Sequence, residues 1–482
     1  MFQRKIKVAN TNGSSNGSSN GHNNASRAKR RKLKRRLYTL EILTSIFILS
    51  LILLYRLLWT STSANFDPPE FRIESTEAPT CRAIASPEDI STTLVTQLSD
   101  DRLWMMQHHC ERYGPHAMSI AVYTNETRAQ IVDELVKMGC RIDGSVDAAT
   151  DVEAEKRSLV SVEVLDAHTH GAWNDYPINE LRNLALRGVK TTHMTYVDID
   201  FWPSTGFYDN VMAPEIRQKM FEDPKLALVI PAFQLNRNHN CTDETRECRE
   251  DHVPMMPRSP YDVKIAFQDK SVRRFESTNE DAQTSTDFHN WFSNQRYPHE
   301  EHEKLYSIPC LRSRHYEPFL TIRYCRELTP PFQPDFSGYG KNKMIWTMQV
   351  VASGFVFSQV GGAFVVHYPH AISDSRHDWN RVPSELVQID SRGRRSVRSP
   401  EKSDGDNLGF DRYHRGEVDR LFVEFRKWLK TSIPEDRARL TVCPDAGDDD
   451  NTLWIDASQK SWVRSRKKAT LRDRIRGRIE KK

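Results

Sequence analysis

The chain of 482 residues lacks a strong excess of charge of either sign, and it lacks cysteine before residue 81. Lys and Arg total 69 against 65 Asp and Glu, so the overall charge says little about partners, and no nucleic-acid partner is predicted. None of the eight cysteines forms a CxxC pair, which argues against a zinc site and favours disulfides. Their spacing does not determine how they pair.

Charge is almost absent from residues 37–59, where Glu41 and Arg56 are the only charged side chains. A segment of this length can span a bilayer as a helix. Eight of the ten residues in 27–36 are basic, which places the N-terminus in the cytoplasm by the positive-inside rule. A cleaved signal peptide would have a shorter basic region, and a core helix would not follow so much positive charge. We predict a disordered basic cytoplasmic tail at 1–36 and a transmembrane signal anchor at 37–59.

This topology makes the chain a type II membrane protein whose remainder is lumenal. The lumen is oxidising, which suits disulfides, and all the cysteines follow the anchor. Asn125 and Asn240 lie in N-glycosylation sequons that would face the same side. The cysteines are Cys81, Cys110, Cys140, Cys241, Cys248, Cys310, Cys325 and Cys443.

Three regions are expected beyond the anchor. A proline-containing stem covers 60–88, a catalytic body covers 89–440, and a charged C-terminal tail covers 441–482. Alternating strand and helix patterns in the body predict an α/β fold with a mostly parallel sheet. Strands are expected at 91–98, 118–124, 192–200, 226–235 and 362–370, helices at 100–113, 127–139, 176–189 and 207–223, and regular structure at 317–324 and 340–354. Residues 236–306 are charged and aperiodic, which predicts an irregular insertion over the site.

Asp198 and Asp200 follow a strand-like run in the sequence MTYVDIDFWPS, residues 194–204. A bare DxD pattern is weak, because DGD at 404–406 and DDD at 448–450 match it equally well. These two carboxylates differ because they end a strand of an α/β alternation, where ligand sites collect. Alternation along an extended chain would send both to the same side.

His367 and His370 end a second predicted strand, AFVVHYPH. Carboxylates suit Mn²⁺ or Mg²⁺, and an imidazole beside them favours Mn²⁺. Either histidine alone would more often be a hydrogen-bonded structural residue. Because both strand ends carry metal ligands, we predict a site that holds a nucleoside diphosphate through a metal ion. In an anchored lumenal protein this favours a sugar-nucleotide transferase over a hydrolase.

The blocks LVTQLSDDRLWMMQHHCERYGPHAMSIAVYT, YPINELRNLALRGVKTTHMTYVDIDFWPS, LVIPAFQ, SGYGKNK and AFVVHYPHA resemble glycosyltransferase family 49. That family includes the C-terminal domain of the LARGE enzymes and a β-1,4-glucuronyltransferase. The blocks occur in family order from about residue 91 to about 375, nearly the whole predicted body. In architecture the chain resembles the single-domain glucuronyltransferase.

The resemblance implies a GT-A fold, in which a mixed, mostly parallel sheet is flanked by helices. It implies a UDP-sugar donor, UDP-glucuronate in characterised members, with Mn²⁺ and inversion at the anomeric carbon. By motif, Asp198, Asp200 and His367 take the metal positions, and Mg²⁺ is the alternative ion. The implied location is the Golgi membrane, with the catalytic domain in the lumen and a glycan as acceptor.

The resemblance also implies donor-binding residues, which are Asn179, Arg182, Asn183, His370 and Lys343. Spacings of three and four residues put the first three on one helical face. Arg182 suits a diphosphate or a sugar carboxylate, because a guanidinium pairs bidentately with either. The alternative for Arg182 is a salt bridge on a surface helix.

An inverting transferase needs a general base beside the acceptor hydroxyl. Asp335 is the only carboxylate in PPFQPDFSGYGKNK, and it is predicted to be that base, although it is displaced from the family position. The family's PAFE reads PAFQ here, so Gln234 lacks a charge. Two alternatives stay open: another UDP-sugar such as UDP-xylose or UDP-galactose, and a non-catalytic GT-A-like subunit that binds glycans or assists assembly. A homodimer also remains an open question.

Overall fold

A computed structural model describes residues 44, 46–50, 69–143, 159–169, 176–238, 241, 246–277, 280–294, 304–381, 387–389, 395–397, 413–434 and 437–444. The chain divides into two compact units, Met1–Pro68 and Pro69–Lys482. In the first unit, 44 and 46–50 are helical. None of the helices in the described ranges has the length and apolar composition needed to cross a bilayer. The predicted cytoplasmic tail, most of the anchor, the stem to residue 68 and the tail from 445 lie outside the described residues.

The second unit is built on a nine-stranded sheet with the order β10-β12-β7-β11-β5-β1-β2-β4-β3. Most neighbours are parallel, but β11 runs antiparallel to both β5 and β7, and β10 runs antiparallel to β12. The α/β prediction with a mixed, mostly parallel sheet is therefore confirmed. The strands are β1 (Thr92–Ser99), β2 (Ala117–Thr124), β3 (Arg141–Ile142), β4 (Leu159–Asp166), β5 (His193–Tyr196), β7 (Leu226–Ile230), β10 (Leu305–Ile308), β11 (Phe319–Arg323) and β12 (Val356–Val360).

A smaller sheet has the order β6-β13-β8-β9. The single strand predicted at 226–235 is divided by Pro231, so that β7 belongs to the large sheet and β8 to the small one. Proline has no N–H to donate to a sheet, which is why the strand pairing changes there. The strands are β6 (Phe201–Pro203), β8 (Ala232–Leu235), β9 (Val272–Arg274) and β13 (Val365–His367). Separately, β14 (Val387–Ile389) pairs antiparallel with β15 (Arg395–Val397).

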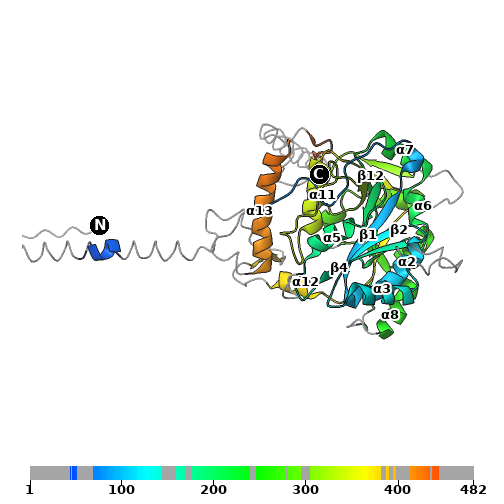
Figure 1. The fold of residues 1–482 in the computed structure, drawn as a ribbon, viewed down its shortest axis with the longest axis horizontal. Helices are drawn as coiled ribbons and strands as arrows, with labels where there is room; N and C mark the ends of the chain where they lie inside the picture. Colours follow the sequence, from blue (N-terminus) through cyan, green and yellow to red (C-terminus); the bar gives the residue numbers. More distant parts are fainter. Residues whose placement is uncertain are drawn as a thin grey trace, which may run out of the picture. The chain divides into compact units, whose positions relative to one another are not determined.

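Helices cover both faces of the large sheet (Figure 1). Successive residues of β1 enter different cores: Leu94 packs with the side chains of α2 and α3, and Val95 packs with those of α5 and α11. A third cluster joins α11 to the long helix α13. The helices include α2 (Met106–Tyr113), α3 (Arg128–Lys137), α5 (Ile178–Leu186), α6 (Phe207–Val211), α7 (Pro214–Glu222), α11 (Asn342–Ala352), α12 (Asp374–Asn380), α13 (His414–Ser432) and the 3₁₀ helices η1 (Pro87–Asp89) and η2 (Asp100–Met105).

The predicted irregular insertion is largely regular in its described parts. Its strands join the two sheets, β9 pairing with β8 and β10 with β12. Its helix α9 starts with a capping box, in which the Ser259 side chain accepts from the Asp262 backbone and Asp262 accepts from Ser259. These elements are short, so their periodicity is weak in the sequence. The helices are α8 (Arg246–His252), η5 (Val253–Met255), α9 (Pro260–Gln268), η6 (Glu280–Gln283) and α10 (Phe288–Asn294).

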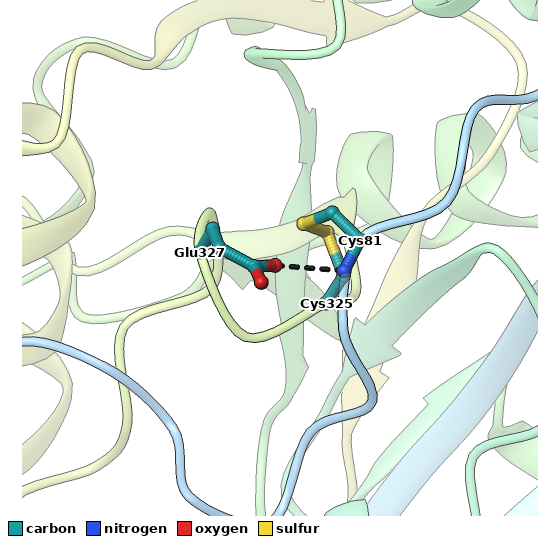
Figure 2. Close-up of side chains that lie close together, drawn as sticks. All are labelled: Cys81, Cys325 and Glu327. Atoms are coloured by element: carbon teal, nitrogen blue, oxygen red, sulfur yellow. Dashed lines mark hydrogen bonds between the residues drawn. A yellow bond between two sulfur atoms is a disulfide. The ribbon is translucent and has the colours of Figure 1, made fainter.

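The segment from residue 69, within the predicted stem, is held against the catalytic body. Phe71 packs against Phe336 and Phe425, with ring centroids 6.3 and 5.4 Å away. Further along, Cys81 forms a disulfide with Cys325, two residues past β11. Figure 2 shows this disulfide together with the Glu327 carboxylate, which accepts from the Cys81 N–H at 2.7 Å. The described part of the stem is therefore a strap on the body.

All eight cysteines are paired, as the lumenal topology predicts. The other bonds are Cys110–Cys140, Cys241–Cys248 and Cys310–Cys443. They connect α2 to the loop before β3, close a loop at the start of α8, and attach the end of the described chain to the loop after β10.

A buried histidine supports the chain between β5 and β6. His109 on α2 is fully buried, and its Nε2 donates to the Ile199 carbonyl at 2.7 Å. Burial lowers the pKa of His109 to about 4, although the bond to Ile199 opposes that shift. The folded protein therefore holds the His109 imidazole neutral. Its partner, Ile199, is the residue between Asp198 and Asp200 in the chain.

The first prediction concerns the strap. Replacing both Cys81 and Cys325 by Ala should destabilise the unit by about 2–5 kcal/mol and expose residues 69–88 to protease. Removing Cys241 and Cys248 is the control, because they lie only 7 residues apart and the Cys81–Cys325 loop spans 244. Thermal denaturation and limited proteolysis would measure both effects. Equal losses in the two variants would contradict a tethering role for the first disulfide.

The second prediction concerns acid stability. Because the pKa of His109 is depressed to about 4, protonation favours the unfolded chain, and stability should fall as pH drops from about 6.5 towards 4. His109 alone should contribute a loss of about 2 kcal/mol at pH 5 relative to pH 8. His109→Gln keeps a donor for Ile199 and should reduce that loss, measured as urea midpoints at both pH values. Exposed His168→Gln is the control. An unchanged pH dependence in His109→Gln would refute this attribution.

Candidate functional site

The two aspartates lie in a turn at the carboxyl edge of the large sheet. Strand β5 ends at Tyr196 and β6 begins at Phe201, whose N–H donates to the Asp198 carbonyl at 2.9 Å. The predicted extended alternation is therefore wrong, because this turn breaks it. Instead, Asp198 and Asp200 contact two different groups of side chains.

Asp198 is neutralised by two cations. Arg182 Nη2 lies 3.0 Å from Asp198 Oδ1, and Lys343 Nζ lies 3.0 Å from Oδ2. The Tyr196 hydroxyl also donates to Oδ1. Burial raises the pKa of Asp198, but Lys343 and Arg182 outweigh it and hold that pKa at about 2. The carboxylate stays ionised without any metal.

Arg182 makes a buried ion pair, not the surface salt bridge considered from the sequence. Its side chain is 2% exposed, and its Nη1 donates to Asn179 Oδ1 at 2.8 Å. Asn179 donates in turn to the Gln333 carbonyl, and Asn183 exchanges two hydrogen bonds with the backbone of Phe332. The predicted helical face thus holds Arg182 and the 332–333 backbone in place. Donor binding by these three residues stays a prediction.

Asp200 contacts a different set of residues. Its Oδ2 lies 3.0 Å from Arg102 Nη1, 2.8 Å from His370 Nε2 and 3.5 Å from His367 Nε2. The two imidazole Nε2 atoms are 3.2 Å apart. Burial raises the pKa of the Asp200 carboxyl, but hydrogen bonds from His367 and His370 bring it well below its usual range. The structure therefore brings His370, expected at the donor, into the group of His367 and Asp200.

Strand register explains why these residues meet. In the small sheet His367 pairs with Phe201, the residue after Asp200. One residue further, the Tyr368 N–H donates to the Asp200 carbonyl at 2.7 Å. Two segments more than 160 residues apart are thus locked side by side.

Donor atoms of Asp200, His367 and His370 all lie within 4.8 Å of one another. Asp200 Oδ1 and His367 Nδ1 are buried and have no hydrogen-bond partner. A carboxylate and two imidazoles that converge in this way fit a divalent transition ion such as Mn²⁺. Asp198 does not belong to this group. The other grouping found in the described ranges, Cys81, Cys325 and Glu327, is the disulfide of Figure 2, so its sulfurs are not free thiolates.

Lys343 lies in the first turn of α11 and is positioned by the tight turn of the SGYGKNK block. Backbone φ is positive at Gly338, Gly340 and Lys341, at +61°, +119° and +57°. A Cβ on Gly340 would lie 2.1 Å from the Trp379 ring, so glycine is required there for space as well as for conformation. Lys343 Nζ then lies 4.3 Å from the Phe319 ring centroid, in a cation–π contact beside Asp198.

Asp335, the predicted base, is exposed in the turn before this block. Burial raises its pKa somewhat, and the charges that act on it are Arg72 and Glu70 of the strap. It has no contact with Asp198 or Asp200 among the described residues.

Sequence reasoning missed Arg102 and Tyr196. Both could have been predicted from their positions at strand ends, as the aspartates were. Arg102 follows β1, the strand beside β5, and Tyr196 is the last residue of β5. Parallel neighbouring strands end at the same edge of a sheet, so a cation just after β1 is a candidate partner for Asp200.

Comparisons with known proteins show which proteins this chain resembles. Xylosyl- and glucuronyltransferase LARGE2 of Mus musculus is 29% identical over 289 residues, which cover 60% of this chain and 35% of that protein. Glycosyltransferase-like protein gnt14 of Dictyostelium discoideum is 27% identical over 311 residues, which cover 61% of this chain and 41% of that protein. The match therefore spans less than half the length of these relatives.

Among solved structures, the crystal structure of GalNAc-T7 with UDP, GalNAc and Mn2+ is 11% identical and covers 60% of this chain and 47% of that chain. Its TM-score of 0.30 is too low to support an argument about fold or site. The family model described as glycosyl-transferase for dystroglycan matches residues 91–388, more than half of the chain. That match includes both aspartates and both histidines, and the chain belongs to this glycosyltransferase family.

Proposed function

We propose that the protein is a Mn²⁺-dependent inverting glycosyltransferase with a GT-A fold, which transfers a sugar from a UDP-sugar to a glycan acceptor. The observation that carries the proposal is the convergence of Asp200, His367 and His370, with Asp200 Oδ1 left unpartnered, in a chain of this family. Mg²⁺ is the alternative ion, since carboxylates bind both.

Asp200, His367 and His370 would hold the ion, which supplies charge neutralisation for the diphosphate of the leaving UDP. Around it, the protein's own cations are already fixed in position. Arg102 is held by Asp200, while Arg182 and Lys343 are held by Asp198. Side chains fixed before the substrate binds need little rearrangement during the reaction, which is what electrostatic preorganisation requires.

We propose glucuronate as the transferred sugar, because its carboxylate needs a cation near the reacting centre. Lys343 suits this role: its Nζ shares Asp198 with Arg182, and its side chain is 13% exposed, so it is reachable by a ligand. Neutral sugars such as xylose or galactose would not need this cation.

The proposed location is the Golgi lumen, with the chain anchored as a single-pass type II membrane protein through residues 37–59. The anchor proposal rests on the sequence of that segment. The four disulfides agree with an oxidising compartment.

The third prediction tests the activity itself. A soluble fragment starting near residue 69 should release UDP from a UDP-sugar in the presence of Mn²⁺, and a glycan acceptor should stimulate the release. Asp200→Asn should lower turnover at least about 100-fold, because removing a metal ligand weakens the charge stabilisation of the leaving group. Exposed Asp166→Asn is the control. Normal folding without any UDP binding or turnover would favour the non-catalytic alternative.

The fourth prediction tests the donor sugar. Wild-type protein should prefer UDP-glucuronate to UDP-glucose, and Lys343→Gln should reduce that preference about 10- to 100-fold, the value of one charge-assisted hydrogen bond. The loss of the Asp198 contact would affect both donors equally, so the ratio of their kcat/KM values isolates the contact with the sugar carboxylate. A wild-type preference for UDP-xylose or UDP-galactose would keep the transferase and overturn the sugar.

A further inference from the structure

The proposed reaction needs a base that Asp335 is badly placed to supply. The charges that act on Asp335 are those of Arg72 and Glu70 of the strap, and Asp335 itself is exposed in a turn. A base must lie within hydrogen-bond reach of the acceptor hydroxyl, which itself must lie beside the donor sugar. We therefore expect the base at the carboxyl end of β5, beside Asp198 and Asp200.

Glu317 lies at that edge because of the direction of β11. This strand runs antiparallel to β5, with Thr321 opposite Thr195, so the start of β11 is beside the end of β5. Glu317 is two residues before β11, and Asp198 is two residues after β5. The same strand contributes Phe319, whose ring lies under Lys343.

The surroundings of Glu317 connect it to the site by charge. Its carboxyl interacts electrostatically with Lys343, Arg182 and Asp198, and also with Glu276 of the loop after β9. Arg376 of α12 interacts with both glutamates and stacks 4.2 Å from the Tyr339 ring centroid. Glu317 therefore interacts by charge with both Lys343 at the start of α11 and Arg376 of α12.

The backbone of Glu317 is fixed, whereas its carboxylate is not engaged. The Glu317 N–H donates to the Ala282 carbonyl at 3.0 Å, and the Gln283 side chain donates to the Glu317 carbonyl at 3.2 Å. Across the described residues, no hydrogen bond or ion pair holds the carboxylate itself. By comparison, both carboxylate oxygens of Asp198 are paired and Asp200 Oδ2 contacts Arg102 and His370, whereas the partly buried Glu317 carboxylate has no such partner and can accept a proton.

We propose that Glu317 is the general base of the transfer, an inference that rests on the proposed function. The acceptor hydroxyl oxygen attacks the anomeric carbon from the face opposite UDP and forms the new C–O bond. The bond from that carbon to the β-phosphate oxygen breaks, and its electron pair leaves with UDP. The hydroxyl proton moves to the Glu317 carboxylate and is later released to water.

The acid strength of Glu317 agrees with this role. Burial raises its pKa, and the neighbouring charges of Glu276 and Asp198 raise it further, while Lys343 and Arg182 oppose them. A carboxylate whose pKa is raised accepts a proton more readily, as a general base must. Glu276 would then assist through its charge without touching the substrate.

The test compares Glu317→Gln with Asp335→Asn in the same soluble fragment. Glu317→Gln keeps the size of the side chain and should lower kcat about 100- to 10,000-fold, the usual contribution of a general base. Its Mn²⁺-dependent binding of UDP, measured by calorimetry, should equal that of wild type. Glu317→Asp should retain part of the activity and shift the acid limb of the pH–kcat profile, a change that a purely structural role would not produce.

The outcomes separate this inference from the proposed function. If Glu317→Gln turns over like wild type, or if Asp335→Asn shows the large loss instead, Glu317 is not the base while the transferase assignment survives. If Glu317→Gln loses UDP binding in step with kcat, its role is structural and the inference fails. Absence of turnover in wild type with every donor would overturn both.

Discussion

The site depends on two neighbouring carboxylates, Asp198 and Asp200, that the fold largely removes from water. The charge of Asp200 repels that of Asp198 and raises the pKa of the Asp198 carboxyl, which makes it harder to ionise. The fold offsets this cost by giving each carboxylate its own partners. Asp198 is paired with Arg182 and Lys343, and Asp200 with Arg102 and two histidines. The first set consists of permanent cations, whereas the second includes two imidazoles, a side chain that binds metal ions, so the Asp200 group is the one suited to a metal ion.

That division depends on elements from distant parts of the sequence. Arg102 follows β1, Arg182 lies on α5, Lys343 starts α11 and the histidines end β13. Contacts other than ion pairs also hold these elements in place. For example, Asn183 of α5 bonds to Phe332, and His367 pairs with Phe201. Removing Asp198 would leave the buried Arg182 without its carboxylate, so the site and the stability of this edge are coupled.

The sequence predicted the class of fold and the place of the site. The period of β1, β2 and α3, and the position of Asp198 and Asp200 after a strand, were sufficient for that. The turn that separates the two carboxylates could not be predicted, because Val-Asp-Ile-Asp continues a strand pattern and the turn is imposed by pairing of Phe201 with His367. Arg102 and Glu317 were missed for a related reason. They lie near the aspartates because β1 and β11 are the neighbours of β5, and the order of strands in a sheet cannot be predicted from local sequence.

The insertion shows the same limit. Its helices are short, and the two sheets accept its strands only through long-range pairing, so residues 236–306 look irregular in isolation. The strap was also assigned to the stem because its prolines resemble a spacer, whereas Phe71 and Cys81 find partners more than 240 residues away. In both cases tertiary contacts outweigh local composition.

The most direct test of this account is pulsed electron paramagnetic resonance of the soluble fragment loaded with one equivalent of Mn²⁺. The account predicts hyperfine coupling to two imidazole nitrogens, one from His367 and one from His370, with one coupling lost in each of the variants His367→Gln and His370→Gln. Tight binding of Mn²⁺ with no nitrogen coupling, or coupling unaffected by both substitutions, would show that the ion binds elsewhere and would contradict the central claim.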